Sequence, residues 1–171
     1  MSAGGKEAQM RPRTKDQRRV LQRIRPDLYR CDLATALDDS VLAELGIEVL
    51  VSLVTHGQWT RRGLDHWHPE PRPPTWTVAD VEDGVPDPFP AAEWRKAVSA
   101  IIAASRRGVP CLVHCSAGRS RSGVAVAVAI SRIEEKAVAD VVTDLRQQGV
   151  WRGCNPRLLV AVDHAVPGPK R

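Results

Sequence analysis

The chain has 171 residues, of which 43% are apolar and 26% charged, so it has room for one globular domain and is neither fibrous nor generally disordered. Its formal charge of +5 arises in the first 25 residues, which carry a net +6 and leave −1 for the remainder. The folded part therefore needs no polyanionic partner, and we do not expect it to bind nucleic acid.

The chain divides into a basic N-terminal arm, one domain and a short tail. Residues 1–22 are polar, rich in glycine and arginine and without hydrophobic periodicity, which predicts a disordered arm. The periodic, apolar part of the sequence predicts a single domain over residues 23–166. Residues 167–171 form the C-terminal tail.

The first predicted elements are a short helix and a buried strand. Residues 41–45 are apolar and follow Asp39 and Ser40, whose oxygens can cap a helix N-terminus. The stretch 47–54 is β-branched and almost continuously apolar, which is typical of a parallel strand buried on both faces. Four prolines within residues 55–74 then predict a long loop without regular structure.

Strands and helices alternate through the rest of the domain. Strands are predicted at 75–79 and 111–114, with an acidic, proline-rich loop at 80–90 and a helix at 91–107 between them. Further helices are predicted at 124–133, 138–145 and 158–166, and the first is apolar on all sides and therefore buried. The alternation predicts an α/β fold, a mostly parallel central sheet flanked by helices.

The sequence also indicates where the protein resides. No apolar run approaches the ~20 residues that span a bilayer, and no apolar segment follows the basic N-terminus as in a secretory signal. The four cysteines lack the spacing of a disulfide framework. We therefore expect a cytoplasmic protein with reduced thiols and without a transmembrane segment.

One segment, His114 to Gly123 with the sequence HCSAGRSRSG, lies between a predicted strand and a predicted helix. The backbone N–H groups of such a turn converge on an anion, and small residues let the backbone curl around it. Arg121 can offer a planar fork to two oxygens of a phosphate, sulfate or vanadate ion. Cys115 stands at the mouth, where the helix N-terminus and Arg121 would stabilise a nucleophilic thiolate.

This segment resembles the Cys-x5-Arg-Ser/Thr signature of the protein tyrosine and dual-specificity phosphatases, with Cys115, Arg121 and Ser122 at the defining positions. A weaker similarity covers residues 24–166 and is closest to the compact, atypical dual-specificity type. The resemblance implies a cysteine-phosphatase-like single domain that needs no cofactor. It further implies hydrolysis of phosphotyrosine in proteins, with phosphoserine and phosphothreonine as additional candidates, through a phosphocysteine intermediate.

The family pattern assigns a role to each residue of the loop. Cys115 attacks phosphorus, Arg121 and the loop amides bind the phosphate oxygens, and Ser122 donates a hydrogen bond to the departing thiolate. His114 supports the loop from the preceding strand. The residues expected to bind substrate are Ser116, Ala117, Gly118, Arg119, Ser120 and Arg121.

A general acid is also required, because the leaving oxygen needs a proton. The family takes it from an aspartate about 30 residues before the cysteine, on a loop. Asp83 stands 32 residues before Cys115 and precedes Gly84, Val85 and Pro86, a context suited to a mobile loop. We choose Asp83, and Asp80 is the alternative.

The sequence is also compatible with other substrates, another activity and other roles for single residues. Other substrates of this fold are phosphoinositides and RNA 5′ phosphates, and a non-catalytic phosphate-binding module has the same cradle. Sulfurtransferase loops instead resemble Cys-x4-Arg, and Ser120 occupies that arginine position here. Arg119 either points to solvent or widens a positive mouth. His56, His66 and His68 lack a completing ligand, so we expect no metal site.

Overall fold

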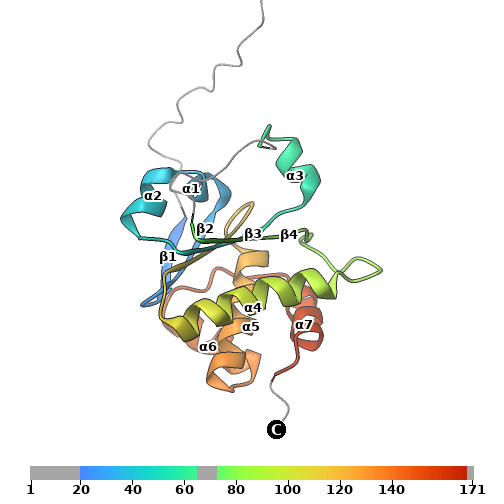
Figure 1. Cartoon of the computed structure of the whole chain (residues 1–171). Coiled ribbons are helices and arrows are strands. Elements are labelled where there is room, and N and C mark those ends of the chain that lie inside the picture. The colour runs from blue at the N-terminus through green and yellow to red at the C-terminus, as the bar shows by residue number, and fades with distance from the viewer. Residues whose placement is uncertain (1–19, 65–72, 169–171) are drawn as a thin grey trace, which may run out of the picture.

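The computed structural model describes residues 20–64 and 73–168 (Figure 1). In chain order the elements are β1 (Leu21–Arg25), β2 (Leu28–Asp32), α1 (Leu33–Ala36), α2 (Asp39–Glu44), β3 (Val49–Leu53), α3 (His56–Thr60), β4 (Thr75–Ala79), α4 (Ala91–Arg107), β5 (Cys111–Cys115), α5 (Ser120–Glu134), α6 (Val138–Gln147) and α7 (Pro156–Ala165).

A five-stranded sheet in the order β1-β2-β5-β3-β4 forms the middle layer. The pairs β2–β5, β5–β3 and β3–β4 are parallel, and only the edge strand β1 runs antiparallel to its neighbour. Figure 1 shows α1, α2 and α3 on one side of the sheet and α4 to α7 on the other. The predicted α/β fold with a mostly parallel, helix-flanked sheet is confirmed.

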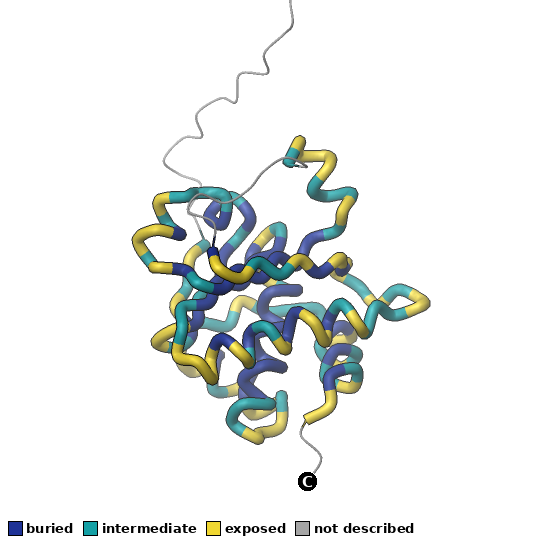
Figure 2. Tube along the Cα trace, in the orientation of Figure 1, coloured by how far each residue is buried: buried dark blue, intermediate teal, exposed yellow. Residues whose placement is uncertain are grey.

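The main core lies between the sheet and the α4–α7 layer. β3 and β5 are buried along their whole length, as expected of central parallel strands covered on both faces (Figure 2). Helix α5 is buried from Arg121 to Ser131, because its alanines and valines let the sheet and the helices α4, α6 and α7 pack closely around it. The expected burial of this helix is confirmed.

The predicted start of one helix and one predicted loop are wrong in detail. The first described element, strand β1, begins at Leu21, and the sequence placed the start of the domain at residue 23. Helix α5 begins at Ser120 and not at residue 124, so Ser120 to Gly123 form its first turn. A helix N-terminus tolerates these polar residues, because its first N–H groups have no partner within the helix.

The stretch predicted as a loop at 55–74 contains helix α3. A capping box starts it, in which the Thr55 hydroxyl accepts from the Gln58 N–H at 3.1 Å and the Gln58 side chain accepts from the Thr55 N–H at 3.3 Å. This reciprocal pair stabilises a helix that is too short to show a hydrophobic period. The prolines at 69 and 71 lie outside the described residues.

Candidate active site

The carboxyl ends of the four parallel strands lie in line. Cys115 is paired in register with Asp32 of β2 and Leu53 of β3, and Leu53 is paired with Ala79 of β4. The segments that follow these strands therefore meet at one edge of the sheet, where ligands of parallel α/β folds usually bind. The segment after β5 is the Cys115 loop, and it leads directly into α5.

The loop between Cys115 and Ser120 packs closely against the end of β2. The Leu33 N–H donates to the Ser116 carbonyl at 3.3 Å. Gly118 has φ +63°, and a Cβ at this position would lie 2.7 Å from backbone atoms of Cys31 and Asp32. Only glycine satisfies both the left-handed backbone and this approach, so the loop can curl as the sequence predicts.

A pocket opens over this loop. Its lining residues are Gln58, Asp83, Cys115, Ser116, Ala117, Arg119, Ser120, Arg121, Arg152, Gly153 and Cys154. The predicted nucleophile, arginine, general acid and most of the predicted loop residues thus line one cavity. The structure brings in four further residues, from α3 and from the segment before α7, which the sequence did not indicate.

Cys115 lies at the bottom of this pocket and is only 2% exposed. Its Sγ is 3.4 Å from the hydroxyl oxygen of Ser122, which can donate a hydrogen bond to a thiolate. Burial raises the pKa of the thiols of Cys31 and Cys154, and it raises the pKa of Cys111 to about 12. These three thiols stay protonated at neutral pH and are therefore poor nucleophiles.

Arg121 is buried, and one edge of its guanidinium is fixed by protein acceptors. Its Nη1 donates to Gln58 Oε1 at 2.7 Å and to the Val81 carbonyl at 3.1 Å. Within the described part of the chain, Nε and Nη2 make no hydrogen bond. The group is thus anchored by neutral oxygens, and it keeps further donors for an anion.

A second buried arginine, Arg30 of β2, lies beneath the first turn of α5. Its guanidinium donates to the Val150 carbonyl at 2.7 Å and to the Gln22 side chain. A Cβ at Gly123 would come within 2.9 Å of Arg30 Nη1, so the glycine makes room for it. Burial lowers the pKa of Arg30 to about 10, and the residue remains a cation at neutral pH near Cys115.

His114 is fully buried in a polar network that crosses three strands. Ser52 Oγ of β3 lies 2.6 Å from His114 Nε2 and accepts a hydrogen bond from Trp76 Nε1 of β4 at 2.9 Å. Since Trp76 supplies one proton, the Ser52 hydroxyl can donate its own to a neutral imidazole. Burial lowers the pKa of His114 from 6.5 to about 4, which agrees with that neutral form.

We expect the stability of the protein to fall as the pH decreases from about 6.5 to about 4. In this range an unfolded His114 binds a proton and the folded one does not, so protons favour unfolding. The shift corresponds to a loss of roughly 3 kcal/mol across the window. Urea unfolding at a series of pH values measures it, and His114→Asn should have a shallower slope. Equal slopes for both proteins would contradict this role of His114.

The two candidate acids have different surroundings. Asp83 is exposed and lines the Cys115 pocket. Asp80 does not line it, and its Oδ1 instead accepts from the backbone N–H of His56 at 3.2 Å, at the start of α3. Asp80 therefore helps to hold α3 in place, and Asp83 is the carboxyl group that can approach a bound phosphate ester.

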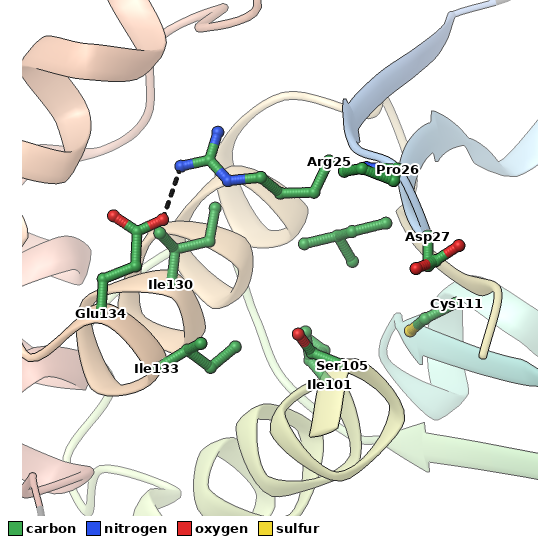
Figure 3. Close-up of a pocket in the computed structure, with 10 residues that line it drawn as sticks. Arg25, Pro26, Asp27, Ile101, Ser105, Cys111, Ile130, Ile133 and Glu134 are labelled. Carbon is green, nitrogen blue, oxygen red and sulfur yellow. Dashed lines mark hydrogen bonds and ion pairs between the residues drawn. The ribbon is translucent and has the colours of Figure 1, made fainter. Parts of the chain in front are cut away.

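A second pocket lies at the opposite end of β5, next to Cys111 and between the ends of α4 and α5 (Figure 3). Its wall is mixed, with Leu28, Ile101 and Ile130 beside polar and charged side chains. Its arginine, Arg25, is paired with Glu134 at 2.8 Å. Cys111 and Cys115 are about 13 Å apart along the strand, so this pocket is remote from the phosphate-binding loop.

The predictions about a metal site and a transmembrane segment can be compared with the described residues only. No group of side chains that could hold a metal ion occurs among residues 20–64 and 73–168, but His66 and His68 lie outside those ranges. None of the described helices is both long and apolar enough to span a bilayer.

Comparisons with known proteins identify a family and several similar structures. The model of the tyrosine phosphatase family matches residues 11–145. No curated protein matches the chain significantly. Among solved structures, human DUSP28 is similar with 23% identity and a TM-score of 0.64, over 85% of this chain and 93% of that one. P. aeruginosa TpbA has 23% identity and a TM-score of 0.57, over 86% and 84%.

A third similar structure is that of PTPMT1 in complex with PI(5)P, with 15% identity and a TM-score of 0.57, over 85% of this chain and 93% of that one. At such identities these similarities concern the fold. They show the single-domain fold of compact dual-specificity phosphatases, as the sequence predicts.

Proposed function

This chain belongs to the tyrosine phosphatase family, and we propose that it hydrolyses phosphomonoesters through a phosphocysteine formed on Cys115. The observation that supports this most directly is the shared pocket of Cys115 and Arg121. A nucleophile at its bottom and an anchored cation in its wall are what in-line attack on a phosphate ester requires.

In the first step the Cys115 thiolate attacks phosphorus, and a sulfur–phosphorus bond forms as the bond to the ester oxygen breaks. Arg121 and the loop amides take up the charge of the equatorial oxygens in the transition state. Asp83 gives its proton to the leaving oxygen, so that an alcohol departs.

In the second step water attacks the phosphorus of the phosphocysteine. Asp83, now a carboxylate, accepts the proton of this water, and inorganic phosphate forms as the sulfur–phosphorus bond breaks. Ser122 donates to the Cys115 sulfur as it leaves as a thiolate, in agreement with the 3.4 Å separation of the two atoms. Both steps use groups of the chain and water only.

The family resemblance favours tyrosine-phosphorylated proteins as substrates, with phosphoserine and phosphothreonine as further candidates. One observation favours a phosphoinositide as a second candidate: none of the described residues that line the pocket has an aromatic or a large aliphatic side chain. A phenyl ring gains little from such polar walls, whereas a polyhydroxylated ring can bind to them. The similar PTPMT1 structure contains PI(5)P.

The alternative of a non-catalytic phosphate-binding module is less well supported. Such a module needs no nucleophile, yet the chain has Cys115 and Arg121 in the pocket and Ser122 within reach of the thiol. We also propose that the protein acts in the cytoplasm. All four cysteines are free thiols, which suits a reducing compartment.

Hydrolysis of a small aryl phosphate tests the proposed function. We expect turnover that is insensitive to a metal chelator and blocked by vanadate, because vanadate imitates the trigonal-bipyramidal transition state that the cradle should bind. Steady-state assays with and without each reagent measure this. Activity that disappears with chelator and withstands vanadate would refute the mechanism.

We expect Asp83→Asn to slow an alkyl phosphate by about 10²-fold and an activated aryl phosphate much less. An alkoxide needs a proton in the transition state, whereas a phenolate with a pKa near 7 hardly does. The basic limb of the kcat/KM profile should also flatten. The matched control is Asp80→Asn, which should cause only a mild loss that is independent of the leaving group. The reverse result would transfer the role to Asp80.

A further inference from the structure

Two arginines at the mouth of the active-site pocket have no partner among the residues that the structure describes. Arg119 of the phosphate-binding loop and Arg152 of the segment before α7 both line the pocket and are exposed. Neither makes a hydrogen bond or ion pair through its side chain with any described residue. Among the described residues of the lining, Asp83 is the one acidic residue.

Three arginines elsewhere on the domain have carboxylate partners. Arg25 is paired with Glu134 at 2.8 Å, Arg132 with Asp163 at 2.6 Å and Arg107 with Glu48 at 3.5 Å. At the active-site pocket, Arg119, Arg121 and Arg152 line the same cavity, so three cations lie near one another. Burial is the main cause that lowers the pKa of Arg30; the charge of Cys115 raises this pKa, and the positive charge of Arg152 lowers it.

Uncompensated cations around a concave site favour anionic ligands. Arg121, buried and held by Gln58, serves the phosphate in the cradle. Arg119 and Arg152 lie in the same lining but are not anchored by acceptors, so their donors are available to a second anion. A flat guanidinium suits a phosphate, whose oxygens it can bind in pairs.

We propose that Arg119 and Arg152 form a second anion subsite, and that the preferred substrate is a polyol that carries two neighbouring phosphates, such as an inositol bisphosphate. One phosphate occupies the Cys115 cradle, and the other binds at the mouth. The polar lining accommodates the hydroxyl groups of such a ring. This inference rests on the proposed phosphatase activity, and it concerns the headgroup chemistry that a soluble ligand and a lipid share.

The test compares kcat/KM for an inositol bisphosphate with adjacent phosphates and for an inositol monophosphate. We expect the wild type to prefer the bisphosphate, and Arg152→Gln to lower this ratio roughly tenfold, since a charge-assisted contact contributes about that factor. Arg119→Gln with Arg152→Gln should lower it further, and Arg152→Lys should retain only part of it, since a lysine keeps the charge without the paired donors. Arg157→Gln is the matched control, because Arg157 is an exposed arginine on α7 outside the pocket.

A short-chain phosphatidylinositol bisphosphate and a tyrosine-phosphorylated peptide complete the substrate set. A preference for the lipid or for the soluble bisphosphate identifies the source, and either supports the subsite. Equal ratios in wild type and Arg152→Gln, or a preference for the peptide, would overturn it.

Binding separates this inference from the proposed function. Calorimetry on Cys115→Ser measures the affinity for both inositol phosphates without turnover. Tighter binding of the bisphosphate, lost in Cys115→Ser with Arg152→Gln, supports the subsite even if the wild type hydrolyses nothing. Equal affinities for the two ligands would overturn the subsite even if the protein is an active phosphatase.

Discussion

We expect Cys115→Ser to lower turnover of a small aryl phosphate by about 10⁴-fold or more, and Cys111→Ser to retain it. A serine hydroxyl at the position of Cys115 stays protonated at neutral pH and forms no phosphocysteine. Both cysteines are buried in β5, so each variant replaces one buried sulfur atom of the same strand with an oxygen atom. They differ in that only Cys115 faces the phosphate-binding pocket.

The comparison separates chemistry from folding. Both substitutions should lower the unfolding temperature, since each places a hydroxyl in a buried site. Only Cys115→Ser should lower turnover in steady-state assays. Rapid quenching with a radiolabelled substrate should trap a phosphoenzyme in the wild type and none in Cys115→Ser. Comparable losses of turnover in both variants would mean that the activity depends on β5 being intact and not on the Cys115 thiol.

The sequence predicted the phosphate-binding loop because the chemistry of this loop is local. Cys115, Gly118 and Arg121 follow one another within a single turn, and their spacing determines where each can point. The residues that complete the pocket are not local. Gln58 follows β3, and the alignment of strand ends brings it to the loop. Arg152 lies between α6 and α7, and the packing of these helices against α5 brings it there. The capping box of Thr55 and Gln58 was a readable signal for α3, but it gave no hint of the contact with Arg121.

The same distinction applies to the fold. Helix α4 and strand β4 were predicted with the observed bounds, because each has an unambiguous pattern and clear end signals. Strands β1 and β2 were not predicted, since arginines interrupt their apolar pattern. Arg30 explains why: it is buried in β2 because its guanidinium reaches the Val150 carbonyl and the Gln22 side chain, contacts that a sequence pattern does not reveal.

We expect Arg121→Lys to lower kcat/KM for an aryl phosphate by roughly 10³-fold, although the charge is kept. Arginines that stabilise the transition state of phosphoryl transfer contribute factors of about this size. Arg121 uses Nη1 to bind Gln58 and Val81, and it has further donors on the same rigid plane for the phosphate. A lysine has one nitrogen on a flexible stem, so it cannot keep the anchor and also bind two phosphate oxygens.

Arg132→Lys is the matched control, because Arg132 lies about 16 Å farther along α5 and binds Asp163 and the Val166 carbonyl. It should lower the unfolding temperature and leave kcat/KM within a small factor. Gln58→Ala removes the anchor but keeps the guanidinium, so its loss should be intermediate between those of the two lysine variants. If Arg121→Lys retained more than about a tenth of the activity, charge alone would suffice, and the anchored fork would not be the basis of phosphate activation here.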